Sequence, residues 1–502
     1  MSDAPSHILA IDQGTTGSTC LVIDRAGRVR GRGYREITQH YPQPGWVEHD
    51  PVELLERTLE AARAAVGGSG VVPDAIGITN QRETTVLWDR GTGEPVAPAI
   101  VWQDRRTAAR CAALGPESRA IAARTGLVVD AYFSATKLEW LLADPGVRAR
   151  AERGELAAGT VDSWLVWHLT GGRVHATDPT NASRTMLFDT EALAWSDELR
   201  TLFGVPEGLL PEVRPSSGSF GATVPGLFGR SVPIMGVAGD QQAALFGQGC
   251  WAAGEGKNTY GTGAFLLLNT GDRRPTPGGG LLATVACDAS GGPAYALEAA
   301  IFIAGAAVQW LRDGLGVIGA AAETESLARS IPSTDGVYFV PALVGLGAPN
   351  WEPAARGTLV GLTASTGRAH LARAALEAMA YGTADVLRVM REQVGAARSA
   401  APTPLRVDGG ATVNDWLMQF QADVLGCTVE RPSMVETTAL GAAGLAGLAA
   451  GVWSSADEFL AQREVTRFEP GGGAAAAQAG AAEWQRAVRA ALAWARDRGE
   501  PA

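Results

Sequence analysis

The chain has 502 residues, of which 46% are hydrophobic and 19% charged, and its formal net charge at pH 7 is −11. This length predicts two large domains or several small ones, and the apolar content excludes a largely disordered chain. The acidic balance argues against a nucleic-acid-binding protein, because neutralising a phosphate backbone needs clustered Lys and Arg.

The cysteines and the hydropathy pattern indicate the cellular compartment in which the protein is expected. The five cysteines are scattered and form no C-x-x-C pair, which argues against a disulfide framework or a zinc site and fits a reducing environment. Residues 1–7 lack the pattern of a signal peptide. The most apolar stretch, residues 439–453, is shorter than the ~20 residues of a membrane span and predicts a buried helix. We therefore expect a cytoplasmic protein without membrane insertion.

The first predicted element is a β-hairpin. Residues 8–12 and 19–24 read as strands on either side of a small, turn-like segment. Its residues, Gly14, Thr15, Thr16, Gly17 and Ser18, can aim backbone N–H groups and hydroxyls at one phosphate. Asp12, just before the turn, suits Mg²⁺, which binds one or two carboxylates together with phosphate oxygens. An ordinary tight hairpin with a satisfied acid is the alternative.

A helix and a strand follow. Residues 52–66 have a helical pattern with Asp50 as N-cap, and residues 75–79 predict a strand. The adjacent pair Arg82–Glu83 comes after this strand and can hydrogen-bond the neighbouring hydroxyls of a polyol. From spacing alone, a solvated surface pair is the alternative. Trp102 and Phe265 are candidates to wall a carbon skeleton, with a core position as the alternative for both.

Asp240 is the candidate catalytic base. Residues 233–240 predict a strand that ends in this acid, and residues 241–246 begin a helix. Open α/β sheets bind ligands at the carboxyl ends of their strands, and phosphoryl transfer to an alcohol uses a group that accepts the hydroxyl proton. A helix N-cap is the structural alternative.

A second strand–turn–strand unit occupies residues 257–269. Its turn, Gly261-Thr262-Gly263, lies 247 residues after the first turn, close to half the chain length. This duplication predicts two related halves that hold one polyphosphate between them. Alternating strands and helices predict the α/β class, with domains at residues 1–250 and 251–502.

Three further segments complete the pattern. Residues 405–410 predict a strand and residues 414–425 a helix. Residues 471–482 are low-complexity Gly/Ala, which predicts a surface loop or connector. Residues 314–319 match G-x-G-x-x-G but follow a helical segment, so the dinucleotide-binding interpretation fails.

Several motifs together carry a resemblance that covers residues 8–495. The chain resembles the glycerol kinases of the FGGY carbohydrate kinase family. The motifs are Asp-Gln-Gly-Thr-Thr at 12–16, Gly-Trp-Val-Glu-His-Asp-Pro at 45–51, Ile-Thr-Asn-Gln-Arg-Glu-Thr at 78–84, Thr-Asn-Ala-Ser-Arg-Thr-Met at 180–186, Gly-Asp-Gln-Gln-Ala-Ala-Leu-Phe-Gly at 239–247, Asn-Thr-Tyr-Gly-Thr-Gly at 258–263 and Val-Asp-Gly-Gly-Ala at 407–411.

The resemblance implies a fold, an activity and a set of site residues. The fold would be two ribonuclease-H-like, actin-like ATPase domains with a cleft between them. The activity would be ATP- and Mg²⁺-dependent phosphorylation of glycerol, with Asp240 as base and Asp12 near the metal. The implied glycerol-binding residues are Arg82, Glu83, Trp102, Tyr132, Asp240, Gln241 and Phe265. The implied nucleotide-binding residues are Thr15, Thr16, Gly17, Thr262, Gly305, Gln309, Gly410 and Asn414.

Some points stay open at this level. Thr19 stands where many members of the family have an arginine near the nucleotide. Residues 229–231 only partly match the loop that binds fructose 1,6-bisphosphate in some relatives, so this regulation is not assumed. A homodimer or homotetramer is expected. A kinase for another polyol or sugar is the nearest alternative, and an actin-like ATPase acting as a filament or chaperone is the alternative outside the enzyme class.

Overall fold

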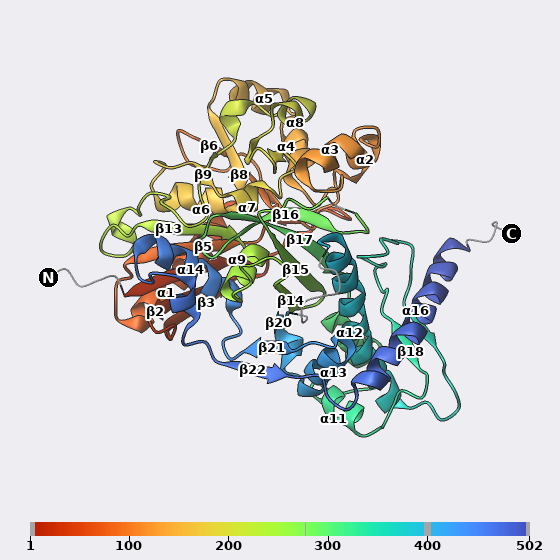
Figure 1. Ribbon diagram of the computed structural model, residues 1–502. Helices are drawn as coiled ribbons and strands as arrows, with labels where there is room; N and C mark the ends of the chain where they lie inside the picture. Colours follow the sequence, from red (N-terminus) through yellow and green to blue (C-terminus); the bar gives the residue numbers. More distant parts are fainter. Residues whose placement is uncertain (1–5, 277, 396–402, 498–502) are drawn as a thin grey trace.

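The structure is a computed structural model that describes residues 6–276, 278–395 and 403–497. Two large mixed sheets, one from each half of the chain, form its framework (Figure 1). A smaller lobe lies above the first sheet, in yellow and orange, and helices of the second half cover the outer face of the second sheet.

The first sheet has the strand order β13-β5-β1-β2-β3. Strands β1, β2 and β3 form an antiparallel meander, and β5 and β13 run parallel to β1. The strands are β1 (His7–Gln13), β2 (Gly17–Asp24), β3 (Val29–Glu36), β5 (Ala75–Asn80) and β13 (Ile234–Gly239).

The second sheet repeats this arrangement with one extra strand at each edge. Its order is β16-β17-β15-β14-β20-β21-β22. Strands β14, β15 and β17 are antiparallel neighbours, and β20 and β21 run parallel with β14, so the central five strands match the first sheet in order and direction. The duplication predicted from the two hairpins is confirmed. The strands are β14 (Gly256–Tyr260), β15 (Ala264–Gly271), β16 (Leu282–Cys287), β17 (Pro293–Ile301), β20 (Leu405–Asp408), β21 (Val429–Pro432) and β22 (Val465–Phe468).

Helices cover both faces of the first sheet. Alternate strand residues point to opposite faces: Leu9 and Ile11 pack with helix α1, whereas Ile8 and Ala10 pack with helices α9 and α14. Helix α9 also packs on the second sheet. The longer helices are α1 (Pro51–Ser69), α6 (Val161–Leu169), α9 (Asp240–Gly247), α12 (Arg368–Gln393), α13 (Asp415–Leu425), α14 (Thr437–Ala450) and α16 (Ala474–Arg496).

The smaller lobe is built on the four-stranded sheet β4-β7-β6-β8. Its strands are β4 (Glu48–His49), β6 (Thr85–Asp89), β7 (Ala99–Ile100) and β8 (Leu156–Thr160). Short helices pack around it: α2 (Ala108–Ala113), α3 (Ser118–Thr125), α4 (Ser134–Leu141), α5 (Pro145–Glu152) and α8 (Asp197–Leu202). The remaining short elements are α7 (Pro179–Ala182), α10 (Gly305–Gln309), α11 (Glu323–Arg329), α15 (Ala456–Leu460), β9 (Ala176–Thr177), β10 (Phe188–Asp189), β11 (Ala194–Trp195), β12 (Glu212–Val213), β18 (Tyr338–Val340) and β19 (Thr358–Val360).

Helix α14 confirms the buried helix predicted from the apolar stretch, and it returns from the second half of the chain to pack on the first sheet. The approach is close. A Cβ on Gly441 would lie 1.8 Å from the carbonyl oxygen of Ala243 in α9, and a Cβ on Gly77 of β5 would lie 2.1 Å from that of Ala442. The division of the chain at residue 250 stays a prediction. Such a division would place α14 in the second domain, although this helix packs on the sheet of the first.

One predicted loop is wrong. Residues 474–482 form the first turns of α16 rather than a connector. Alanine has the highest intrinsic helix propensity, and the Gly/Ala composition masked the fact that Ala477 and Trp484 face the core.

By contrast, the predicted N-cap is confirmed, because the Asp50 carboxylate accepts a 2.8 Å hydrogen bond from the Val52 amide. Within the described residues, no helix combines the length and hydropathy needed to span a membrane.

Candidate active site

Asp240 lies at the junction of β13 and α9. The N-cap position belongs to Gly239, and Asp240 is the first helical residue, so the N-cap alternative is wrong. Its Oδ1 atom accepts a 2.7 Å hydrogen bond from the backbone N–H of Gln241 and lies 3.0 Å from Nε of Arg82. The Asp240 side chain is still 30% exposed. A carboxylate that is oriented on one side and open on the other can receive a proton from a bound hydroxyl.

Arg82 and Glu83 are buried, so the surface-pair alternative is wrong. Their exposed fractions are 3% and 1%. Glu298 of β17 accepts two hydrogen bonds from the Arg82 guanidinium, at 2.6 and 2.9 Å. Arg184 donates through Nε to Glu83 at 2.7 Å, and its Nη2 atom lies 3.1 Å from Glu298 but out of line for a hydrogen bond. Two arginines and two glutamates therefore form one buried network beside Asp240.

The charges in this network are balanced by neighbours. Burial raises the pKa of the Glu83 carboxyl, opposed by Arg82 and Arg184. Burial acts in the same direction on Glu298, but the two guanidinium groups outweigh it and lower its pKa to about 2. Glu298 is therefore ionised at any working pH and fixes Arg82 as a cation.

Sequence reasoning missed Arg184 and Glu298 as functional residues. Arg184 belongs to the motif at residues 180–186, and the residue pattern alone indicates no role for it. Glu298 lies 216 positions after Arg82 in the chain. The one feature that marks it in the sequence is that it is the single acid in the otherwise apolar strand Pro293–Ile301. An acid in a buried strand needs a charged partner, but the sequence does not say which one.

Two of the three aromatic candidates, Trp102 and Tyr132, lie next to the first hairpin. The rings of Trp102 and Tyr132 meet edge to face with centroids 5.5 Å apart. The Trp102 indole N–H donates to Oγ1 of Thr15 at 2.9 Å, which connects a predicted substrate residue to a predicted phosphate residue. Phe265 pairs with Thr259 across β14 and β15 and is partly buried. Tyr132 and Trp102 are therefore brought together, whereas within the described residues no aromatic pair or hydrogen bond joins Phe265 to them.

Asp12 is the penultimate residue of β1 and shares its surroundings with other acids. Burial, followed by the charges of Asp240 and Glu436, raises the pKa of Asp12 to about 7. Facing carboxylates of this kind are stabilised by a divalent cation. In the described part of the chain no group of three His, Cys, Asp or Glu could hold a metal alone, but Mg²⁺ needs only one or two carboxylates when phosphate and water supply the rest. Asp12 therefore fits the predicted ion.

Both predicted hairpins are present, and each is closed by a hydrogen bond within its turn. In the first, the Gly14 amide donates to the Gly17 carbonyl at 2.9 Å, and the carbonyl of Thr16 accepts from Ile37 at 3.0 Å. In the second, the Gly261 amide donates to Gly263 at 2.8 Å.

Gly305 lies against the second hairpin. Its amide donates to the Gly261 carbonyl at 3.0 Å, and a Cβ there would lie 2.6 Å from that oxygen. Glycine is therefore needed for the close approach, and it places Gly305 beside the exposed Thr262.

The remaining nucleotide candidates are less tightly connected. Gly410 opens a short 3₁₀ turn after β20. Asn414 caps α13 by accepting from the Leu417 amide at 2.9 Å, so it has a structural role of its own. The Gln309 side chain is exposed at the end of α10. Among the described residues no hydrogen bond joins Gln309 to Gly410 or Asn414, and their shared role stays a prediction.

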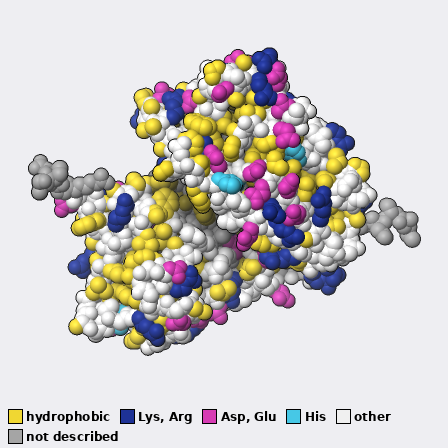
Figure 2. Space-filling model, turned by 180° about the vertical axis from the view of Figure 1, so that it is seen from behind, with side chains coloured by type: hydrophobic (Ala, Val, Ile, Leu, Met, Phe, Trp, Pro, Cys, Tyr) yellow, Lys and Arg dark blue, Asp and Glu magenta, His cyan; other side chains and the backbone are white. Residues whose placement is uncertain are grey.

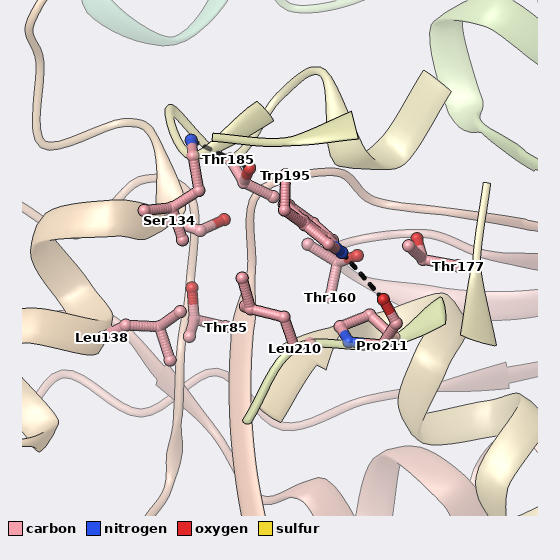
Figure 3. A pocket seen from close by; sticks show the side chains of 11 residues that line it. Thr85, Ser134, Leu138, Thr160, Thr177, Thr185, Trp195, Leu210 and Pro211 are labelled. Atoms are coloured by element: carbon pink, nitrogen blue, oxygen red, sulfur yellow. Dashed lines mark hydrogen bonds between the residues drawn. The ribbon is translucent and has the colours of Figure 1, made fainter. Parts of the chain in front are cut away.

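Two kinds of hollow are visible. Figure 2 shows a groove between two lobes of the molecule. Figure 3 shows a small cavity lined by Thr85 and Ser134 together with Leu138, Thr160, Thr177, Thr185, Trp195, Leu210 and Pro211. None of the predicted substrate residues lines this cavity, but Thr85 and Ser134 both donate to the backbone carbonyl of Glu83. The cavity therefore lies behind the predicted polyol site.

Comparisons with known proteins agree with this architecture. Residues 7–247 match the N-terminal domain of the FGGY family of carbohydrate kinases, and residues 256–450 match its C-terminal domain. The chain belongs to the FGGY family of carbohydrate kinases.

Individual FGGY relatives match almost end to end. A glycerol kinase from Bordetella parapertussis is 56% identical over 98% of both chains. The structure of Plasmodium falciparum glycerol kinase with ADP superposes with a TM-score of 0.91 at 34% identity, covering 97% of this chain and 99% of that one. A gluconate kinase from Lactobacillus acidophilus has a TM-score of 0.87 at 19% identity, with 98% and 99% coverage, which shows the common fold alone. The predicted two-domain, actin-like kinase fold is confirmed.

Proposed function

We propose that this chain transfers the γ-phosphoryl group of ATP to a terminal hydroxyl of glycerol, giving sn-glycerol 3-phosphate and ADP. The observation that carries the proposal is the Asp240 carboxylate, which is held by Arg82 at 3.0 Å yet keeps an open face. Relatives named glycerol kinase, at 56% identity over nearly the whole chain, support the choice of substrate.

The polyol site combines hydrogen-bonding groups with an aromatic wall. Arg82 and Glu83 offer a fixed donor and a fixed acceptor to adjacent hydroxyls, and Gln241 lies next to Asp240. Trp102, Tyr132 and Phe265 cover the carbon skeleton. A site that matches each hydroxyl rejects ligands lacking one, because its own buried polar groups would then be unpaired.

The nucleotide site uses the two hairpins. Thr15, Thr16 and Gly17 on one side, with Thr262 on the other, present backbone N–H groups and hydroxyls to the phosphates. Gly305, whose own N–H donates to the Gly261 carbonyl, lets the chain lie close against the second hairpin beside the phosphates. Gln309, Gly410 and Asn414 contact the rest of the nucleotide. Asp12 would hold Mg²⁺, which supplies charge neutralisation at the phosphates.

Asp240 accepts the proton of the attacking hydroxyl. Arg82 keeps its carboxylate oriented, and the backbone N–H of Gln241 donates to the same oxygen. Approach of the two halves around bound substrates would exclude water, which prevents transfer of the phosphoryl group to water. The cytoplasmic location and the homo-oligomer stay predictions, and regulation by fructose 1,6-bisphosphate is not assumed.

The test is ADP release by the purified chain with ATP and Mg²⁺, measured with and without glycerol. We expect turnover to depend on glycerol, and kcat/KM for glycerol to exceed that for erythritol and xylulose. A higher kcat/KM for xylulose would assign the site to a sugar, and ADP release that is independent of any acceptor would contradict the proposal.

A further inference from the structure

The chain contains forty arginines but two lysines, Lys137 and Lys257. Both lysines are fully buried, with an exposed fraction of 0%. Lysine is among the residues least often found in that state. An ammonium group is compact and has three donors, whereas guanidinium is planar and larger, so this chain keeps lysine at two interior positions while using arginine elsewhere. Both positions lie beside the predicted polyol site.

Lys137, on helix α4, contacts the backbone of two predicted glycerol-binding residues. Its Nζ atom donates to the carbonyl oxygen of Tyr132 at 2.8 Å and to that of Glu83 at 3.3 Å. Ser134 and Thr85 donate to the same Glu83 carbonyl, at 3.0 and 3.1 Å. Three donors therefore converge on one carbonyl oxygen.

The converging donors explain how Glu83 keeps an unfavourable backbone. Its φ is +62°, a left-handed conformation that L side chains rarely adopt. Such strain persists where surrounding contacts hold it, and it concentrates at functional sites. With this backbone, the Glu83 carboxylate reaches Arg184 at 2.7 Å.

Lys257, on strand β14 of the second sheet, fixes a side chain instead. Its Nζ atom donates to Oε1 of Gln241 and, at 2.7 Å, to Oγ1 of Thr259. A lysine ammonium can only donate, so it requires the oxygen end of the Gln241 amide. The two N–H groups of that amide are left to face other partners, and a hydroxyl oxygen of the acceptor substrate is such a partner.

The charged surroundings differ between the two lysines. Burial lowers the pKa of Lys257, while Asp408, Asp240 and Glu298 act in the opposite direction and Arg82 adds to the lowering.

For Lys137, burial lowers the pKa to about 7 against the charges of Glu83, Asp104 and Asp130, and Arg105 adds to the lowering. Keeping two desolvated amines is costly, which argues for a use at the site they adjoin.

We propose that Lys137 and Lys257 are positioning residues for the polyol site: Lys137 fixes the backbone of Glu83 and Tyr132, and Lys257 orients the Gln241 amide as a donor to the acceptor hydroxyl. The inference rests on the proposed glycerol kinase activity. The two residues act from the two halves of the chain on different residues of the same site.

The test compares Lys137→Met and Lys257→Met with Arg153→Met, which removes an exposed cation paired with Glu155. Methionine keeps the apolar stem and removes the donors. We expect each lysine variant to raise KM for glycerol by about 10-fold or more, the size of a lost charged hydrogen bond. KM for ATP should stay within about 2-fold, and Arg153→Met should match the parent.

A double-mutant cycle separates positioning from general support of the fold. If Lys257 acts through Gln241, Lys257→Met and Gln241→Ala should be non-additive in KM for glycerol. For Lys137, Ser134→Ala removes another donor to the Glu83 carbonyl and should raise KM for glycerol by about 3-fold. If either methionine variant does not fold, Ser134→Ala and Thr259→Val still test the same contacts.

Three outcomes would overturn the inference. One is a folded lysine variant whose KM for glycerol stays within 2-fold of the parent. The second is an equal rise in KM for glycerol and for ATP, which would assign the lysine a structural role. The third is additivity in the cycle, which would show that Lys257 does not act through Gln241. Failure of the parent to release ADP with glycerol would instead reject the proposed function.

Discussion

Glu298 and Arg82 form a two-bonded ion pair between the halves of the chain, with distances of 2.6 and 2.9 Å. Arg82 follows β5 of the first sheet, and Glu298 belongs to β17 of the second. The same guanidinium contacts Asp240 at 3.0 Å. The proposed base is therefore held by an arginine whose own position depends on the other sheet.

The first prediction concerns this pair. Glu298→Gln removes the charge that compensates Arg82 and Arg184, leaving two buried cations with Glu83. Breaking a buried ion pair from one side costs about 3–5 kcal/mol, so the urea midpoint should fall and KM for glycerol should rise. Glu155→Gln, in a surface pair, is the control and should leave both unchanged. An unchanged midpoint for Glu298→Gln would show that the pair is not needed.

The second prediction concerns the base. Asp240→Asn keeps the size of the side chain and loses the proton acceptor. We expect kcat to fall by about 10²–10⁴, the usual contribution of a general base, while the dissociation constant for glycerol measured by calorimetry changes little. Near-normal turnover in this variant would remove Asp240 from the role.

The third prediction concerns acid stability. His49 is fully buried, and burial, with His40 as the next cause, lowers its pKa to about 4 from an ordinary 6.5. Between these values the unfolded chain binds a proton that the folded chain does not. The resulting stability is complete above pH 6.5 and is lost as the pH falls towards 4.

The size of the effect is on the order of 2–3 kcal/mol, and His49→Gln should remove it. Urea midpoints measured at pH 7.5, 6 and 5 should therefore fall less steeply with pH in the variant than in the parent. Other buried groups contribute equally to the pH dependence of the variant and of the parent, so their contributions cancel when the two profiles are subtracted. Parallel pH profiles would show that His49 is protonated in the folded state.

The fourth prediction concerns the packing of helix α14 against helix α9. A methyl group on Gly441 would lie 1.8 Å from the Ala243 carbonyl, so Gly441→Ala must push α14 away from α9. Overpacking of this kind costs about 1–3 kcal/mol or more, and the melting temperature should fall. Gly67→Ala is the matched control, because no atom lies within 4 Å of its Cβ and its helix α1 gains from alanine. A higher melting temperature for Gly441→Ala would contradict the packing described.

Much of the fold was predictable from local patterns. The two hairpins, the strand that contains Asp12, the strand that ends just before Asp240, and the cap at Asp50 depend on residues close together in the chain. Helix α16 was not predicted, because a Gly/Ala run carries a weak hydrophobic pattern and its buried residues, such as Trp484, come later in the helix.

The site was predictable only in part. Asp240 and the hairpin threonines stand at strand ends, which is a local signal. The burial of Arg82 has no local signal, because it depends on Glu298, which belongs to a distant strand that the fold brings next to Arg82. Lys137 lies 54 residues after Glu83 and contacts its backbone carbonyl, which no residue pattern specifies.

The central claim is that the Asp240 carboxylate meets the attacking alcohol, and a crystal structure of the chain with glycerol and a non-hydrolysable ATP analogue tests it most directly. The account predicts a distance of about 2.6–3.2 Å between a carboxylate oxygen of Asp240 and a terminal hydroxyl oxygen of glycerol. Glycerol bound with every hydroxyl beyond about 5 Å from that carboxylate, so that not even one water could bridge them, would contradict it.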